Sequence, residues 1–246
     1  MRPRVQTKDA LTFPARINKY LAHAGYSTRT GADTLITEGK VFVNGRKAQL
    51  GDKVQAEDTV EVRGNQKRAA SYAYYAYHKP RGVITHSPQG DEEDIQGALE
   101  EYPELEGTFP IGRLDKDSSG LIILTNDGRV TDRMLNPRHE HEKEYAVRVE
   151  RPLRASFKES MEAGVDIEGY RTKPCIVRVT GEKTFRVRLT EGKKHQIRRM
   201  VVAMHNEVRE LERVSVLNIQ LGSLPKGAYR KIEGDELKGF LKALGL

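Results

Sequence analysis

The sequence predicts an α+β protein of two unequal domains: a small helix-rich one, followed by a larger one on a mainly antiparallel mixed β-sheet with flanking helices. Apolar and polar residues alternate with the period of two typical of strands, for example over 145–149 and 185–189. The few helical runs follow no regular βαβ rhythm. Charge is uneven, because residues 1–70 carry 13 Lys and Arg against 7 Asp and Glu, and residues 71–246 carry 29 against 28.

Composition limits the class of protein further. The chain has 246 residues, of which 37% are hydrophobic and 31% charged, as in soluble globular proteins. No apolar run approaches the roughly 20 residues that span a bilayer, and no apolar core follows residues 1–4, so we expect a cytoplasmic protein without a membrane segment. The single cysteine, Cys175, and the isolated pair His139 and His141 do not have zinc-ligand spacing, so we expect no metal.

The first third of the chain contains the pattern of the small domain. Residues 1–14 are charged and aperiodic, which indicates a flexible basic tail. A helix is expected from Ala15 to Gly25, and a second one from an N-cap at Thr28 to Gly39. Residues 41–45, Val-Phe-Val-Asn-Gly, predict a strand that enters a hairpin turn. We place this domain at residues 15–63.

The larger domain is predicted at residues 72–246, after a polar linker at 64–71. Its first strand is rich in tyrosine and ends in Lys-Pro-Arg-Gly at 79–82. Apolar residues at helical spacing predict a helix that ends at Gly164 and another near the carboxyl end. Their buried faces are formed by Leu153, Phe157 and Met161, and by Leu237, Phe240, Leu241 and Leu244.

The most informative stretch is Gly-Arg-Leu-Asp-Lys-Asp-Ser-Ser-Gly at 112–120, which precedes four aliphatic residues at 121–124. In an extended segment, Arg113 and Asp115 project to one side while Leu114 projects to the other. The glycines and the apolar run predict a turn into a buried strand. The pattern therefore indicates an acid held beside a cation on a rigid strand edge.

A second chemical motif is Gly-Lys-Lys-His-Gln-Ile-Arg at 192–198. Ile197, Met200, Val201 and Met204 have helical spacing, so we expect a core-anchored helix whose other faces are free for polar contacts.

Two competing motif interpretations fail. Residues 115–120 resemble the start of a calcium loop, but its twelfth position is Asn126, where a bidentate glutamate is needed. Gly107 and Gly112 have phosphate-loop spacing, but Arg113 and Leu114 replace the required Lys and Ser or Thr.

The motifs together resemble those of the RsuA-like family of bacterial ribosomal RNA pseudouridine synthases. The aspartate block, Lys-Pro-x-Gly at 79–82, Glu-Lys-Glu-Tyr at 142–145 and the motif at 192–198 occur in the family's order. Residues 110–118 look most like the members that act on large-subunit (23S) RNA, and small-subunit (16S) specificity is the alternative. Residues 15–63 resemble the RNA-binding domain first seen in ribosomal small-subunit protein four.

That small domain departs from its family at one place. The family usually has Ser-Arg-Arg-Glu at the start of the second helix, whereas this chain has Thr-Arg-Thr-Gly at 28–31. The change removes an expected phosphate contact, and Gly31 costs up to about 1 kcal/mol of helix propensity. We therefore expect the domain to be present and to bind RNA more weakly.

The resemblance implies a role for four residues. Asp115 is the catalytic carboxylate, as nucleophile at ribose C1′ or as base at C2′. Tyr145 lies against the uracil, and a core position on its alternating strand is the alternative. Arg198 pairs with the aspartate. Arg113 takes the place of the flipped base in the RNA helix, and a surface ion pair with Asp115 or Asp117 is its alternative.

The resemblance also implies the reaction and the partner. Uridine becomes pseudouridine when the C1′–N1 bond breaks and a C1′–C5 bond forms, which is redox-neutral and needs no cofactor or metal. The partner is ribosomal RNA or a precursor subunit, and we expect a monomer. The competing hypothesis is a non-catalytic RNA-binding or ribosome-assembly factor. The candidate RNA-binding residues are cations: Arg16, Lys19, Arg29, Lys40, Arg46, Lys47, Lys193, Lys194 and Arg199.

Overall fold

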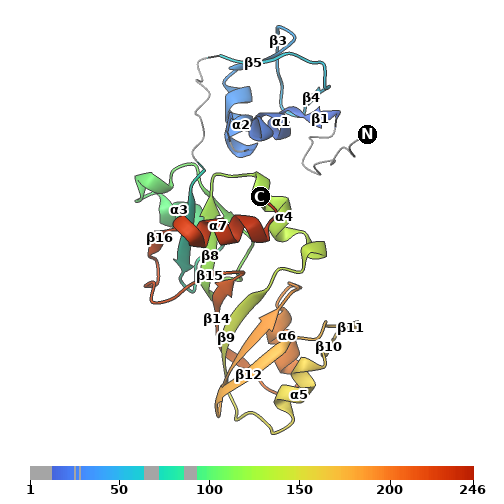
Figure 1. Ribbon diagram of the computed structural model, residues 1–246, viewed down its shortest axis with the longest axis vertical. Coiled ribbons are helices and arrows are strands. Elements are labelled where there is room, and N and C mark those ends of the chain that lie inside the picture. Colours follow the sequence, from blue (N-terminus) through green and yellow to red (C-terminus); the bar gives the residue numbers. More distant parts are fainter. Residues whose placement is uncertain (1–12, 25, 28, 64–71, 86–92) are drawn as a thin grey trace. The chain divides into compact units, whose positions relative to one another are not determined.

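The computed structural model describes residues 13–24, 26–27, 29–63, 72–85 and 93–246. Most of the predicted tail, the predicted linker and the predicted N-cap Thr28 lie outside these residues. The described residues form two compact units: those up to Tyr72 together with 126–129, and those of 73–125 together with 130–246. Figure 1 traces both units.

The first unit consists of two helices and short strands, as predicted, but the first helix begins at Ile17 because Ala15 and Arg16 form a short strand. Its helices are α1 (Ile17–His23) and α2 (Arg29–Thr37), and β1 (Ala15–Arg16) pairs with β4 (Lys53–Val54). A three-stranded sheet has the order β3 (Arg46–Lys47), β2 (Val41–Val43), β5 (Val60–Val62). The turn between β2 and β3 is the predicted Asn44-Gly45, and both residues have the positive φ of a tight hairpin turn.

The second unit is built on a mixed nine-stranded sheet. Seven strands follow one another in the order β12 (Ile176–Gly181), β13 (Thr184–Leu189), β9 (Lys143–Val149), β14 (Val208–Val216), β8 (Ser119–Thr125), β6 (Tyr74–Lys79) and β16 (Tyr229–Lys231). In addition, β15 (Ile219–Gln220) pairs with β14, and β7 (Phe109–Ile111) pairs with β8. Among the described residues only β8 and β14 pair in parallel, which confirms the predicted mainly antiparallel sheet.

Helices flank this sheet. They are α3 (Ile95–Leu99), α4 (Arg129–Leu135), α5 (Phe157–Glu162), α6 (Gln196–Ala203) and α7 (Gly234–Ala243), with short 3₁₀ turns η1 (Pro103–Leu105) and η2 (Pro137–His139). A separate hairpin joins β10 (Asp166–Ile167) to β11 (Tyr170–Arg171). Within the described part of the chain, no helix has the length and apolar character to cross a membrane.

The predicted apolar run at 121–124 forms the buried part of β8. Leu121 and Ile123 pack into a cluster that includes Phe240 of α7, and Ile122 and Leu124 pack into a cluster with Ile95 of α3. A strand that is buried on both faces has a continuous run of apolar residues in its sequence. The aspartate motif therefore leads directly into one of the most firmly held strands of the sheet.

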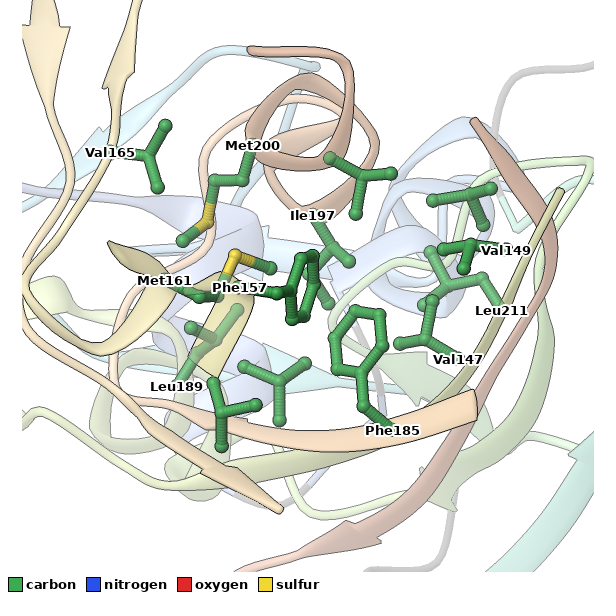
Figure 2. Packing of buried hydrophobic residues seen from close by; sticks show 14 of the residues in the cluster. Val147, Val149, Phe157, Met161, Val165, Phe185, Leu189, Ile197, Met200 and Leu211 are labelled. Carbon is green, nitrogen blue, oxygen red and sulfur yellow. The ribbon is translucent and has the colours of Figure 1, made fainter. Parts of the chain in front are cut away.

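A further cluster anchors α6 to the other half of the sheet. Figure 2 shows Ile197 and Met200 of α6 beside Phe157, Phe185 and the neighbouring aliphatic side chains. The Phe157 and Phe185 rings meet edge to face, with their centroids 4.8 Å apart. The helical spacing of the predicted motif is thus explained, and the start of α6 is fixed by the core.

Candidate active site

The aspartate motif lies in a loop between β7 and β8, which corrects the expectation of a strand edge. Its rigidity comes instead from hydrogen bonds, because five consecutive backbone carbonyls each accept one. The donors are the Arg213 guanidinium for Arg113 (3.3 Å), the Thr85 hydroxyl for Leu114 (2.8 Å), the Ser118 amide for Asp115 (3.0 Å), the Gly82 amide for Lys116 (2.8 Å) and the Arg198 guanidinium for Asp117 (2.9 Å). Asp115 is therefore presented on a loop that is fixed before any substrate binds.

Leu114 anchors this loop to the core. Its side chain is buried in the cluster beneath α3, as the alternation of the motif predicts. Its amide donates to the hydroxyl of buried Thr85 at 3.1 Å, and the same hydroxyl donates back to its carbonyl. Thr85 thus clamps the residue that precedes the acid, and the sequence analysis did not single it out.

Two structural features fix the loop from the side of β14. Arg213 is 3% exposed, and it donates to the carbonyl of Leu121 at 2.7 Å as well as to the loop. Gly120 has φ of +117°, and a Cβ there would lie 2.4 Å from the backbone N and O of Arg213. Only glycine therefore permits the parallel pairing of β8 with β14 at this point.

His195 lies beside the acid. Its Nε2 is 3.5 Å from Oδ1 of Asp115, and the two side chains are 48% and 39% exposed. The residue is the N-cap of α6 and has a left-handed backbone with φ of +52°. The motif at 192–198 contains this histidine, but the sequence analysis gave it no role. The pair joins the two motifs at a partly exposed point where a substrate could reach both side chains.

The predicted pairing of Arg198 with Asp115 is wrong for this structure. No ion pair joins the two among the described residues; Arg198 instead donates to the Asp117 carbonyl at 2.9 Å and to the Ser118 hydroxyl at 3.3 Å. The arginine has the predicted location, at the acid's loop. Its contact is with the backbone of that loop, because its guanidinium reaches the turn after the acid.

Arg113 is exposed, and in the described part of the chain its side chain makes no ion pair with Asp115 or Asp117. The partner of Asp117 is Arg81, at 3.7 Å. The simple surface ion pair considered for Arg113 is thus absent, and its side chain is available to solvent beside the acid.

Tyr145 lies half-buried on β9, between Val187 of β13 and Arg213 of β14. Its ring packs against two apolar clusters, that of α5 and α6 and that of α3. The residue therefore contributes to packing, as the alternative holds, and it keeps part of its surface open.

Burial shifts the pKa of two lysines of the second unit, and one of them, Lys79, lies near Asp115. Burial lowers the pKa of Lys79 to about 8, and the charge of Asp115 opposes this shift. Its ammonium donates to the carbonyls of Pro80 (2.8 Å) and Val83 (2.6 Å). Burial also lowers the pKa of Lys143 to about 8, with Arg213 adding to the effect. The lysine of the Lys-Pro-x-Gly segment thus holds a turn and adds positive charge close to Asp115.

A carboxylate network shapes the loop before α6. Glu191 accepts from the side-chain amide of Gln196 at 2.6 Å and from the hydroxyl of Tyr170 at 2.7 Å. Gln196 in turn accepts from the amide of Lys193 at 2.9 Å. These bonds hold the segment that presents Lys193 and His195.

The predicted RNA-binding cations differ in their surroundings. Eight of them are exposed: in the first unit Arg16, Lys19, Arg29, Lys40, Arg46 and Lys47, and in the second unit Lys193 and Lys194. Lys40 pairs with Glu38, and Arg46 with Asp52. Arg199 is occupied by Glu168 at 2.6 Å and by the Ile167 carbonyl, so its side chain serves the protein's own loop. Among the described residues, no group of three or more His, Cys, Asp or Glu is placed to hold a metal ion.

The chain matches two protein-family models. One is described as RNA pseudouridylate synthase and covers residues 73–203, and the other is the S4 domain over residues 15–60. The two models cover separate parts of the chain. The first includes the residues discussed around Asp115 except Arg213, which lies beyond residue 203.

Named relatives align with this chain over most of its length. The chain is 38% identical to the dual-specificity RNA pseudouridine synthase RluF of Escherichia coli K12 over 232 aligned residues. The alignment covers 93% of this chain and 79% of that protein. The chain is 34% identical over 231 residues to the ribosomal large subunit pseudouridine synthase B of Bacillus subtilis 168, covering 91% and 94%. A crystal structure of a pseudouridylate synthase aligns with TM-score 0.67 and 27% identity, over 91% of this chain and 98% of the other.

Proposed function

Because the chain belongs to the RNA pseudouridine synthase family, we propose that it isomerises a specific uridine of ribosomal RNA to pseudouridine, with Asp115 as the catalytic carboxylate. The observation that carries this proposal is the loop of Asp115, whose five successive carbonyls are held while the acid itself stays partly exposed beside His195. A fixed carboxylate open to a substrate suits attack at a sugar carbon or removal of a sugar proton.

The other site residues act on the RNA. The target uridine must leave the base stack to reach Asp115, and exposed Arg113 would occupy the space that it vacates. The half-buried ring of Tyr145 would lie against the uracil. Arg198 would keep the loop in place through the Asp117 carbonyl. Lys193 and Lys194, beside the acid's neighbour His195, would contact phosphates.

We propose that both parts of the chain bind RNA. We divide it into a basic tail at 1–14, an RNA-binding domain at 15–63, a linker at 64–71 and the catalytic domain at 72–246. Exposed cations of the small domain would increase affinity through phosphate contacts that carry no sequence information. Such an enzyme would act in the cytoplasm as a monomer, on ribosomal RNA or on a precursor subunit, without a cofactor.

Large-subunit RNA is the proposed substrate. The Bacillus subtilis relative is named for the large ribosomal subunit, and residues 110–118 look most like the members that act on that RNA. The name of the Escherichia coli relative states dual specificity, so a second RNA substrate is a further outcome to test.

The proposal is tested by mapping pseudouridine in a strain that lacks the gene. Pseudouridine-specific chemistry followed by sequencing should show one or a few sites lost from 23S rRNA and restored by the wild-type gene, but not by Asp115→Asn. Loss confined to 16S rRNA would redirect the substrate, and unchanged 23S and 16S maps would contradict the proposal. In that case the protein would be an RNA-binding factor.

A further inference from the structure

The proposed reaction requires the loss of a proton from uracil C5. When C5 bonds to C1′, it carries both the ribose and its original hydrogen. That hydrogen must leave before the ring becomes aromatic-like again. Both roles left open for Asp115, at C1′ or at C2′, lead to this same intermediate. A base is therefore needed near C5, in addition to the carboxylate that acts at the sugar.

The position of that base follows from the position of Asp115. C1′ and C2′ are adjacent atoms, and the carboxylate must contact one of them. C5 is bonded to C1′ in the intermediate, so its hydrogen lies within a few bond lengths of the carboxylate. A base that takes this proton must lie within about 3 Å of C5, and it must therefore lie close to Asp115.

His195 meets this requirement. Its Nε2 lies 3.5 Å from Oδ1 of Asp115, without a hydrogen bond between them among the described contacts, so the nitrogen can face a substrate. The backbone of His195 is fixed, because its carbonyl accepts from the Arg199 amide at 2.9 Å and α6 is anchored in the core. Imidazole is the side chain most often used for proton transfer near neutral pH.

The other groups around the acid are less suited to accept a proton. Arg198 and Arg213 are guanidinium donors whose hydrogens go to loop carbonyls. Lys79 is buried, with its ammonium directed at the Pro80 and Val83 carbonyls. Tyr145, which the resemblance places against the uracil, is a further candidate, but a phenol already carries a proton on its oxygen.

We propose that His195 is the base that removes the C5 proton, an inference that depends on the proposed function. The C5–H bond breaks and its proton goes to Nε2 of His195, while the electron pair of that bond forms the C5=C6 double bond. The electrons of the C6=N1 bond return to N1, which gains a proton from water. The step is redox-neutral, and it leaves an imidazolium beside the Asp115 carboxylate.

The exposure of His195 fits this role. The C5 hydrogen must finally reach water, and the side chain of His195 is 48% exposed, so it can pass the proton to solvent. A buried base would need a separate exit path.

The test is a hydrogen isotope effect in a histidine variant. Ribosomal RNA transcribed with uridine carrying hydrogen or deuterium at C5 is converted by the wild type and by His195→Gln under single-turnover conditions. We expect His195→Gln to be slower by roughly 100-fold, as for loss of a general base. We also expect its reaction to be clearly slower with deuterium, because breaking the C5–H bond then limits the rate.

His205→Gln is the matched control. His205 is exposed at the other end of α6 and also has a left-handed backbone, with φ of +60°, so the same substitution imposes similar local strain. This variant should keep the wild-type rate, and both variants should keep the wild-type affinity for the RNA.

The remaining outcomes overturn the inference. A wild-type rate in His195→Gln, or a slow rate without a C5 isotope effect, would show that the histidine is not the base. An isotope effect that appears in Tyr145→Phe but not in His195→Gln would assign the step to Tyr145. No pseudouridine from the wild-type protein on any ribosomal RNA would instead contradict the proposed function itself.

Discussion

The guanidinium of Arg198 donates a 2.9 Å hydrogen bond to the backbone carbonyl of Asp117, two residues beyond the acid that the family resemblance assigns as its partner. A second bond, at 3.3 Å, reaches the Ser118 hydroxyl. The arginine thus holds the loop of Asp115 and leaves the carboxylate itself open to a substrate. The proposed catalysis by Asp115 therefore relies on the hydrogen bonds that hold the backbone around it.

Replacing Arg198 should therefore lower the rate of isomerisation without abolishing RNA binding. In Arg198→Ala the Asp117 carbonyl loses its donor, and a displacement of Asp115 by about 1 Å is expected to reduce kcat roughly 100-fold. Arg198→Lys should recover part of the rate, since one ammonium can replace one of the two bonds. Single-turnover rates and filter-binding affinities measure both effects, and an unchanged rate in Arg198→Ala would contradict the role.

Two substitutions of Thr85 distinguish the contribution of its hydroxyl group from that of its side-chain volume. Thr85→Val fills the same volume but leaves the buried Leu114 amide and carbonyl without their partner. We expect a loss of about 1–3 kcal/mol in the free energy of unfolding and a slower reaction. Thr85→Ser, which keeps the hydroxyl, should stay close to the wild type in rate. Equal rates in the Val and Ser variants would show that the clamp does not position Asp115.

Gly120→Ala should be strongly destabilising. The new Cβ would lie 2.4 Å from the Arg213 backbone, and φ of +117° is unfavourable for alanine. Steric conflict and backbone strain together are expected to lower the free energy of unfolding by about 3 kcal/mol or more. Gly128→Ala, where nothing lies within 4 Å of the added carbon, is the control. Denaturant unfolding of the two variants checks this, and similar stabilities would contradict the close approach of β8 and β14.

Lys79 should make stability depend on pH in the alkaline range. Burial lowers its pKa from 10.5 to about 8, so below pH 8 the folded state contains a buried charge that the unfolded state exposes to water. Between about pH 8 and 10.5 the folded state loses this proton first, the unfolded state binds more protons, and the contribution of Lys79 to stability rises with pH.

The measurement compares the wild type with Lys79→Met at several pH values from 7 to about 10. The difference in free energy of unfolding should shift in favour of the wild type as the pH rises, while other titrating groups cancel in the comparison. If this difference stays constant, or shifts in favour of Lys79→Met, then burial does not lower the pKa of Lys79 in the folded protein.

Local patterns in the sequence predicted much of the fold. The Asn44-Gly45 hairpin, the buried strand β8 and helix α6 each follow from short-range chemistry: turn propensity, an apolar run and helical spacing. The predicted core position of Leu114 was confirmed for the same reason.

The supports of the site could not be predicted in this way, because they come from distant parts of the chain. Thr85 lies 29 residues before Leu114, and Arg213 lies 100 residues after Arg113. Nothing in the local pattern of either residue marks its partner. The same reason explains Arg198, whose presence at the site followed from its motif, whereas its acceptor depends on how the turn after Asp115 folds.

The most direct test of the central claim is the release of tritium from ribosomal RNA labelled at uracil C5. The wild-type protein should release label to water in proportion to the pseudouridine formed, while Asp115→Asn should release none and bind the same RNA with roughly wild-type affinity. Because the loop carbonyls, and not the carboxylate, hold this segment, the variant should also fold normally. Release of tritium by Asp115→Asn at a rate near that of the wild type would show that Asp115 is not the catalytic carboxylate.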